Sequence, residues 1–498
     1  MKALKNIILP LFALLLLNGC DDFLGDNVDP NKEQLDGIEP ADLLPTSIYY
    51  TSSGFYATAS SICQFSQQLA SYFQPGADTQ EETQIEGAWS NIYLQALPDL
   101  KTLATLAVDE NATGYLGIAK VLQASNLGLA TDQWGDVPAS AATLGEEDFT
   151  PSFDPQEEVY NQVNTLLDEA IALLQQSDGS GMNVGSDDLI YNGNLNKWLK
   201  TAYFLKARYA IHLTEVDQTT AVAQALTAIP NSFESNADDF QLVYNSRNFN
   251  PWNSGVVLPN NTGNFSVLLS DQIVSLMDGT AIPFGSVEMD PRLPLITTYG
   301  ADDEEFLGAI NGSAGVHEFG DPNISANTNL GADDFYSSQS APIIMGSYAE
   351  LKFIEAEALF LQNGGTATST GSTGAAYAAY LEGIQANMDK LGVSSSASSA
   401  YLGDTSIAVG AGNLTMALIM REKYIATFLN PESFVDLRRY DFNPNVFIGL
   451  ELPENHNETL NGQWVRRAQY PSSEQTRNGS EVEAVIQPIS TGVWWDRD

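Results

Sequence analysis

The sequence has few basic residues and only two cysteines, and each scarcity argues against a class of function. The 498 residues include 21 lysines and arginines against 63 aspartates and glutamates, for a formal net charge of -42. A field of this sign repels a phosphate backbone, which argues against DNA or RNA binding. It also favours neutral or basic ligands over anionic ones. Cys20 and Cys63 are too few for a disulfide framework or a cysteine-ligated zinc site.

The sequence also lacks the local motifs of several enzyme classes. It contains no Gly-x-Ser-x-Gly elbow, no His-Glu-x-x-His pair and no phosphate-binding loop. Cys63 lies among apolar residues at helical spacing, which is typical of a core thiol. We therefore expect no catalytic residues. A secreted glycoside hydrolase remains an alternative, because it needs only two carboxylates in a cleft and 63 acids leave many pairs open.

The N-terminus has the pattern of a secretory signal. Lys2 and Lys5 precede an apolar run over residues 7–17, which is too short to span a bilayer as a helix. Residues 17–20, Leu-Asn-Gly-Cys, resemble the lipobox of bacterial lipoproteins. That resemblance implies a signal peptide over 1–19 and a lipid anchor on Cys20. An ordinary signal peptide with a chance cysteine is the alternative.

The rest of the chain has the apolar spacing of a mainly α protein. Residues 20–40 are expected to form an extended tether, and residues 41–498 a single globular domain. Pairs of amphipathic helices joined by turns resemble tetratricopeptide units, so we expect an irregular helical repeat scaffold with few short strands. The predicted helices cover residues 61–73, 89–108, 113–131, 155–174, 195–213, 347–362, 375–391 and 415–429.

Two segments depart from this helical pattern. Residues 233–342 are rich in Gly, Asn, Asp, Pro and aromatics and show little helical periodicity. Long irregular segments inside a compact domain are usually functional, so we expect the ligand-binding surface there. Residues 444–498 are expected to be loop-like, with some short strands.

Several motifs, taken together and in their order along the chain, resemble the SusD/RagB family of outer-membrane nutrient-binding lipoproteins. They are CDDFL at 20–24, AKVLQA at 119–124, TDQWGDVP at 131–138, YAELKFIEAEA at 348–358, REKY at 421–424 and SFVDLRRY at 433–440. The resemblance implies a helical, tetratricopeptide-like fold and attachment to the outer face of the outer membrane. Asp21 and Asp22 would then be the sorting signal for that location. It also implies a glycan ligand and a SusC-like TonB-dependent transporter as partner. A peptide-binding or scaffold lipoprotein of the same fold is an alternative.

A sugar-binding site is expected to contain aromatic residues in polar loops. A pyranose has an apolar face that stacks on an aromatic ring and a rim of hydroxyls that bind amides and acids. Trp252 is the leading candidate because its neighbours are asparagines, whereas Trp89 and Tyr93 share helical spacing that also suits core packing. The candidates form three clusters: Tyr72, Phe73 and Trp89; Phe249, Asn250, Trp252, Asn253 and Phe265; and Phe335 and Tyr336.

The charged residues of the matching motifs are interpreted as structural. Some of Glu350, Glu355 and Glu357 are expected to form partly buried ion pairs with Arg421, Arg438 or Arg439, which would fix helix packing. The acidic runs at 26–29 and 302–305 offer oxygen ligands for calcium but lack the EF-hand spacing. No cofactor or metal is therefore expected.

Overall fold

The computed structural model describes residues 37–73, 76–143, 148–300, 305–316 and 327–497. The chain divides into residues 1–39 and a compact unit over 40–498, and only the second is described below. The predicted signal peptide, the lipidation site Cys20 and the acidic run at 26–29 lie outside the described residues, as does most of the run at 302–305. None of the described helices is long and apolar enough to cross a membrane.

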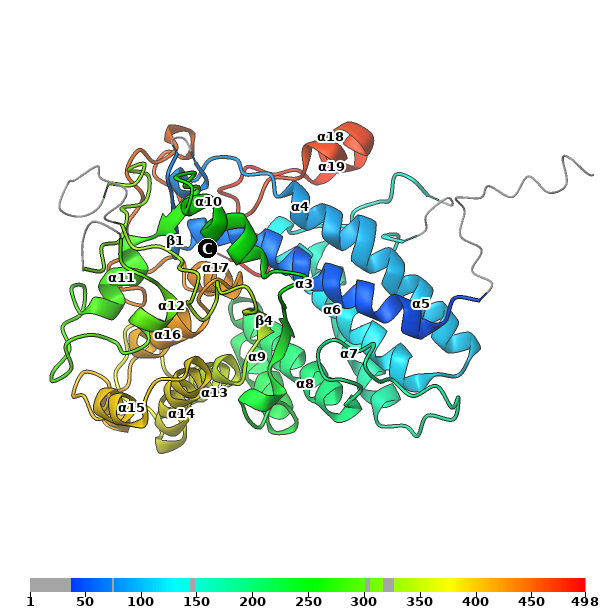
Figure 1. Cartoon of the computed structure of the whole chain (residues 1–498), viewed down its shortest axis with the longest axis horizontal. Helices are drawn as coiled ribbons and strands as arrows, with labels where there is room; N and C mark the ends of the chain where they lie inside the picture. The colour runs from blue at the N-terminus through cyan, green and yellow to red at the C-terminus, as the bar shows by residue number, and fades with distance from the viewer. Residues whose placement is uncertain (1–36, 74–75, 144–147, 301–304, 317–326, 498) are drawn as a thin grey trace, which may run out of the picture. The chain divides into compact units, whose positions relative to one another are not determined.

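The mainly α prediction is confirmed for the compact unit (Figure 1). Helices contact one another in sequential pairs, notably α6 with α7, α8 with α9 and α13 with α14, as in a helical repeat scaffold. One continuous apolar core connects the pairs. The helices of the first half are α3 (Pro40–Phe65), α4 (Glu86–Trp89), α5 (Leu97–Asp109), α6 (Thr113–Trp134), α7 (Gln156–Leu174), α8 (Leu195–His212) and α9 (Thr214–Ala228).

The second half contains shorter helices and two small antiparallel sheets. Strand β1 (Leu69–Ser71) pairs with β3 (Val267–Leu269), and β2 (Phe240–Val243) pairs with β4 (Pro342–Gly346). The helices are α10 (Leu258–Asn260), α11 (Asp271–Asp278), α12 (Leu293–Ile296), α13 (Tyr348–Gln362), α14 (Gly374–Leu391), α15 (Ser395–Leu402), α16 (Met416–Ala426), α17 (Glu432–Arg439), α18 (Ser472–Arg477) and α19 (Gly479–Val485).

Side-chain caps explain why several helices begin where the sequence predicts. Each cap oxygen accepts a hydrogen bond from a backbone N–H of the first turn, which otherwise has no partner within the helix. The capping residues are Asn194 before α8, Ser347 before α13, Thr373 before α14 and Thr415 before α16.

Two predictions of secondary structure are wrong. The helix predicted over 61–73 ends at Phe65, because Gln67 adopts a left-handed backbone (φ 57°) and the chain continues into β1. The Gln68 amide holds this turn through bonds to the carbonyls of Tyr424 and Thr427, both at 3.0 Å. In the described part of 444–498, the expected strands are replaced by α18, α19 and a single-residue bridge at Gln469.

Gly128→Ala is expected to destabilise the protein although alanine favours helices. A Cβ at position 128 of α6 would overlap the phenol of Tyr209 on α8. We expect a loss of about 1–3 kcal/mol in the free energy of unfolding, measured by urea denaturation. Gly87→Ala in α4 is the control, because its Cβ would meet Ala57 at an ordinary 3.7 Å. Equal stability of the two variants would contradict the close approach of α6 and α8.

Candidate functional site

A cavity of about 380 Å³ brings two of the three predicted aromatic clusters together, and we call it the aromatic pocket. Helix α3, the β1–β3 pair and residues 252–256 form its walls. Its volume lies within the range of about 300–1,000 Å³ that is common for small-ligand sites. The lining residues are Tyr56, Ser60, Gln64, Ser71, Phe73, Gly76, Ala77, Trp252, Gly255, Val256, Ser266 and Val267.

The β1–β3 pair places residues 267–269 opposite residues 69–71. Ser71 lies opposite Val267, and the backbone N–H of Tyr72 donates to the carbonyl of Ser266 at 3.3 Å. The buried Asp78 carboxylate accepts from the N–H groups of Ser71 at 2.9 Å and Gly312 at 2.8 Å. Burial raises the pKa of Asp78, although these hydrogen bonds act in the opposite direction. The strand pair and this carboxylate together fix the backbone at the pocket mouth.

Three predicted aromatic residues lie side by side at this mouth. The ring centroids of Tyr72 and Phe73 are 5.0 Å apart, and those of Tyr72 and Phe265 are 6.1 Å apart. The Phe73 side chain is 59% exposed, which is high for a large apolar residue. Phe73 therefore offers an apolar ring at the entrance to the pocket.

Trp252 lines the pocket, but its predicted position in an open loop is wrong. It directly precedes the π-helical segment η6 (Asn253–Val257) and is only 2% exposed. Its ring meets Tyr56 edge to face, with centroids 4.9 Å apart. A Cβ at Gly255 would come within 2.5 Å of the Tyr56 hydroxyl, so glycine is required for this close packing. Trp252 and Tyr56 thus form the inner wall of the pocket.

The asparagines beside Trp252 bind backbone carbonyls, and they do not mark the open polar loop that the sequence predicts. Asn250 is fully buried and donates from Nδ2 to the carbonyl of Ala341 at 3.0 Å. Asn253 is also buried and donates to the carbonyl of Ser337 at 2.8 Å. The Nδ2 groups of both amides are already engaged by the chain and both side chains are buried, so the expectation of open-loop amides is wrong for both. Phe249 beside them is half-buried.

The remaining predicted residues lie away from the pocket lining. Tyr336 is buried and packs on Phe428, with ring centroids 5.5 Å apart, while Phe335 is partly buried beside it. Trp89 is 3% exposed and its ring lies 5.1 Å from that of Trp134. Tyr336 and Trp89 therefore contribute to the core, as the helical spacing of Trp89 had allowed.

Sequence reasoning missed the contribution of α3 to the pocket. Tyr56, Ser60 and Gln64 come from a helix that was predicted only at its end. A signal was present, because Ile48, Phe55, Ala59 and Ile62 recur at helical spacing, and all four are buried. The same helical spacing would have placed Tyr56, Ser60 and Gln64 together on another face of this helix.

A second groove, of about 550 Å³, lies beside Trp89 and does not include the aromatic pocket. Its floor comes from α4 and the π-helical segment η2 (Ser90–Ala96), and its walls come from residues 138–143, residues 148–151 and α18. Figure 1 shows α18 and α19 beside α4. The described lining residues are Trp89, Tyr93, Leu94, Pro98, Pro138, Ala142, Thr143, Asp148, Phe149, Thr150, Pro151, Glu474, Arg477 and Asn478.

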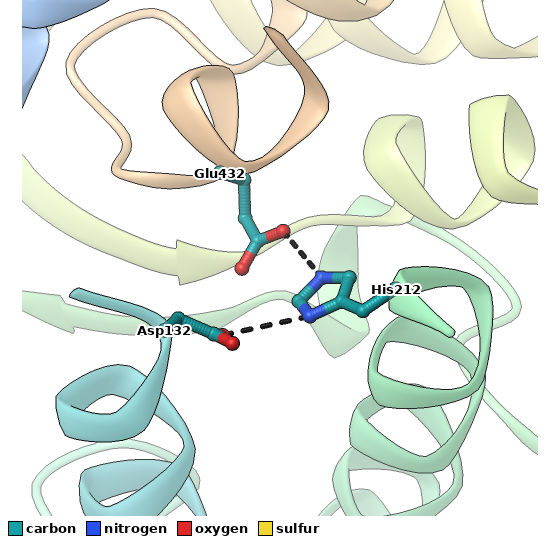
Figure 2. Close-up of side chains that lie close together, drawn as sticks. All are labelled: Asp132, His212 and Glu432. Atoms are coloured by element: carbon teal, nitrogen blue, oxygen red, sulfur yellow. Dashed lines mark hydrogen bonds and ion pairs between the residues drawn. The ribbon is translucent and has the colours of Figure 1, made fainter. Parts of the chain in front are cut away.

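A histidine lies between two carboxylates deep in the core (Figure 2). His212 of α8 approaches Asp132 of α6 at 3.5 Å through Nδ1 and Glu432 of α17 at 2.9 Å through Nε2. Burial alone lowers the pKa of His212, but the charges of Glu432 and Asp132 outweigh it and raise this pKa to about 9. Both ring nitrogens are then protonated, and the imidazolium lies between two carboxylates as an ion triad.

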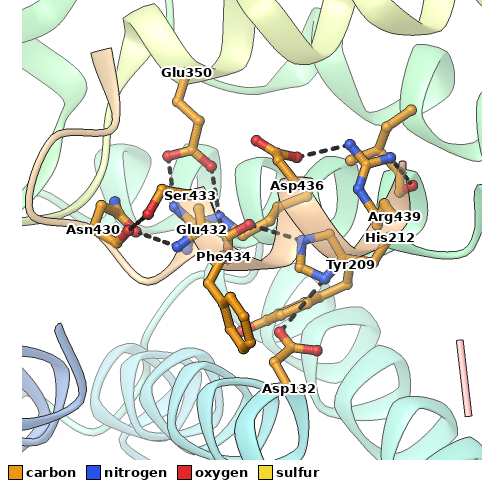
Figure 3. Close-up of polar contacts among 12 residues, drawn as sticks. Asp132, Tyr209, His212, Glu350, Asn430, Glu432, Ser433, Phe434, Asp436 and Arg439 are labelled. Atoms are coloured by element: carbon orange, nitrogen blue, oxygen red, sulfur yellow. Dashed lines mark hydrogen bonds and ion pairs between the residues drawn. The ribbon is translucent and has the colours of Figure 1, made fainter. Parts of the chain in front are cut away.

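Further charged residues of α17 continue this triad into a buried network (Figure 3). The Arg208 guanidinium donates twice to Glu350, at 2.7 Å in each case. Arg439 donates to Glu357 at 2.8 and 3.0 Å and to Asp436 at 2.8 Å. The predicted pairing of Glu357 with an arginine of the 433–440 motif is confirmed, whereas Glu350 pairs with an arginine of α8.

The described lining of the aromatic pocket offers groups that bind by stacking and by hydrogen bonds. Its described lining contains aromatic rings, hydroxyls and the Gln64 amide, and none of these described residues is an aspartate, glutamate or histidine. A glycoside hydrolase needs two carboxyl groups flanking the scissile bond. The carboxylates of the His212 cluster are buried among helices, where a polymer has no access.

Comparisons with known proteins agree with this architecture. The family model SusD-like_2, described as "Starch-binding associating with outer membrane", matches residues 32–471. Among solved structures, a SusD/RagB family protein from Bacteroides thetaiotaomicron is 23% identical, with a TM-score of 0.74, 92% of this chain covered and 99% of that chain covered. A chitin-binding protein has the same identity and TM-score, with 92% of this chain and all of that chain covered. A chitin-binding SusD homologue from Flavobacterium johnsoniae is 20% identical, with a TM-score of 0.67 and coverages of 90% and 99%. No protein of curated function matches by sequence.

Proposed function

The chain belongs to the SusD/RagB family, and from that premise we propose that it captures a glycan in the aromatic pocket without cleaving it. The observation that carries the proposal is the pairing of an exposed Phe73 ring with a neutral, hydroxyl- and amide-bearing lining. The ring covers the apolar face of a sugar, while Gln64, Ser60 and Ser266 bind its hydroxyls.

The known ligands of similar proteins suggest the ligand class. The matching family is described as starch-binding, and two similar structures are described as chitin-binding. Starch and chitin chains are both neutral in their common forms, which suits a chain of net charge -42. We therefore place neutral oligosaccharides first among the candidates.

The proposal extends to location and delivery. The lipobox-like residues before Cys20 and the outer-membrane association in the family description support a lipid-anchored protein at the outer face of the outer membrane. There it would pass the bound glycan to a SusC-like TonB-dependent transporter. Replacing Cys20 with alanine should release the protein from the membrane fraction, and pull-down of such a transporter from membranes would test the partnership.

Phe73→Ala is expected to weaken glycan binding by about five- to thirtyfold, because it removes the exposed ring that stacks on sugar. The measurement is calorimetric titration of maltohexaose and chitohexaose into the chain lacking residues 1–20, which retains the whole compact unit of 40–498. Gly255→Ala should weaken binding as well, since its Cβ would displace Tyr56 from the inner wall.

Tyr49→Ala is the matched control for Phe73→Ala. Tyr49 is also an exposed aromatic, at 42%, but it does not line the pocket. Binding by the wild type with release of reducing ends would favour the hydrolase alternative. Binding of neither sugar by the wild type would refute glycan capture in the form proposed here and would favour peptide capture. Equal losses of glycan affinity in the Tyr49 and Phe73 variants would show that the aromatic pocket is not the binding site.

A further inference from the structure

The second groove shares three features with the aromatic pocket although no lining residue is common to both. Each lies beside a π-helical segment, η2 for the groove and η6 for the pocket. A tryptophan immediately precedes each segment, Trp89 in one case and Trp252 in the other. Each opens beside a strongly exposed phenylalanine. Because π-helical segments are rare and recur at functional sites, the repetition points to a second site.

The groove combines an apolar wall with an aromatic floor. Phe149 is 77% exposed and Leu94 is 59% exposed, and both line the groove. Beneath them Trp89 and Tyr93 are almost fully buried, with ring centroids 4.3 Å apart. The Tyr93 hydroxyl donates to the carbonyl of Pro138 at 2.9 Å, which fixes the floor. Large apolar side chains exposed beside a groove of this size mark a binding surface.

A buried amide in the groove has unused hydrogen-bonding capacity. Asn478 lines the groove and is only 2% exposed. Its Nδ2 donates to the carbonyl of Pro151 at 2.9 Å, while its Oδ1 has no hydrogen-bond partner among the described residues. A buried oxygen without a partner is costly, and a ligand hydroxyl would satisfy it. This observation is independent of the exposed rings and also points to a hydroxyl-bearing ligand.

The charges at the groove favour a neutral ligand. Glu474 and Arg477 are both in the lining, so their opposite charges offset each other locally. A carboxylate, a guanidinium and an amide beside aromatic rings are the groups that bind sugar hydroxyls above a stacked ring face. A protein surface docking here would bury this polar rim together with the apolar wall, which makes a polar, ring-shaped ligand the better match.

We propose that the second groove is a separate glycan subsite that holds neutral pyranose units through Phe149, Arg477 and Asn478. The proposal rests on the proposed function, since it assigns a second contact for the same class of ligand. A polymer that reaches both sites would bind more tightly than a short fragment, because the second contact forms at a high effective concentration.

The test combines Phe149→Ala and Phe73→Ala in the chain lacking residues 1–20, titrated with maltohexaose and chitohexaose. Two classes of site are expected for the sugar that binds. Phe149→Ala should weaken one class at least about fivefold, Phe73→Ala the other, and the double variant both. Arg477→Gln should reproduce the effect of Phe149→Ala, and unchanged melting temperatures would show that the variants are folded.

Several outcomes separate this proposal from the proposed function. One class of site, lost in Phe73→Ala and unaltered in Phe149→Ala, would overturn the second subsite and leave glycan capture standing. Loss of a protein partner but not of sugar in Phe149→Ala would show a protein-docking surface instead. Binding of neither sugar by the wild type would overturn both proposals. A fall in affinity for soluble starch or chitin chains in Phe149→Ala that exceeds the fall for hexaoses would support two-site capture.

Discussion

Arg439→Met is expected to lower the free energy of unfolding by about 3–5 kcal/mol, because it leaves two buried carboxylates, Glu357 and Asp436, sharing the single positive charge of Lys423. Arg439 and Glu357 are both fully buried, and Asp436, which also accepts from Arg439, is 4% exposed. Methionine fills a similar volume, so the loss of charge dominates over the loss of packing. The measurement is the urea midpoint and its slope for the chain lacking residues 1–20.

Two further variants make the result interpretable. Lys120→Met removes the cation of a pair with Glu169 whose side chains are 21% and 50% exposed, and its cost should stay below about 1 kcal/mol. Arg439→Met combined with Glu357→Met should cost less than the sum of the single changes, because the double variant leaves one buried charge fewer. Additive losses, or equal losses at Arg439 and Lys120, would contradict the buried network.

The wild-type protein is expected to lose stability as the pH rises from 6.5 toward 9, by an amount on the order of 3 kcal/mol for His212 alone. The pKa of His212 is raised from 6.5 to about 9 in the folded state. A group with a raised pKa contributes its full stability below its unfolded pKa and loses it as the pH passes its folded pKa. The contribution of His212 is therefore complete at pH 6 and is lost above pH 9.

His212→Gln identifies the source of this dependence. Glutamine keeps a neutral hydrogen-bonding group beside Asp132 and Glu432 but does not titrate, so the pH dependence between 7.5 and 9 should largely disappear. Burial lowers the pKa of His456, so that residue titrates below this window. The readout is the unfolding free energy of both proteins at pH 6, 7.5 and 9. Parallel curves for the two proteins would show that the imidazole is neutral.

The long helices were predictable from the sequence because their signals are local. The apolar stripe of α7 recurs at helical spacing over residues 159–174, and the cap of α8 lies directly before its first residue. Residues 348–358 and 433–440 could also be interpreted as partners in ion pairs, since their charges had to be buried with opposite ones.

The arrangement of the pocket could not be predicted, because it depends on contacts between distant segments. Tyr72 and Phe265 lie near each other through the three-residue pairing of β1 with β3, and no local pattern sets the register of so short a pair. The asparagines around Trp252 failed as a loop signal because their amides bind backbone carbonyls of residues 337–342. Such side-chain to backbone bonds have no signature in the sequence.

The buried network also limits where proteases that cut after lysine or arginine can cleave the folded chain. Among the basic residues that the structure describes, eight are buried, namely Arg208, Arg292, Arg421, Lys423, Arg438, Arg439, Arg466 and Arg467. Most of the other described ones lie within helices, which do not fit an extended protease cleft without unfolding. In the described part of the chain, Arg247 and Arg497 are the exposed basic residues in non-helical backbone. Within the described part of the chain, the ion pairs that hold the core together thus also leave few cleavage points for trypsin-like enzymes.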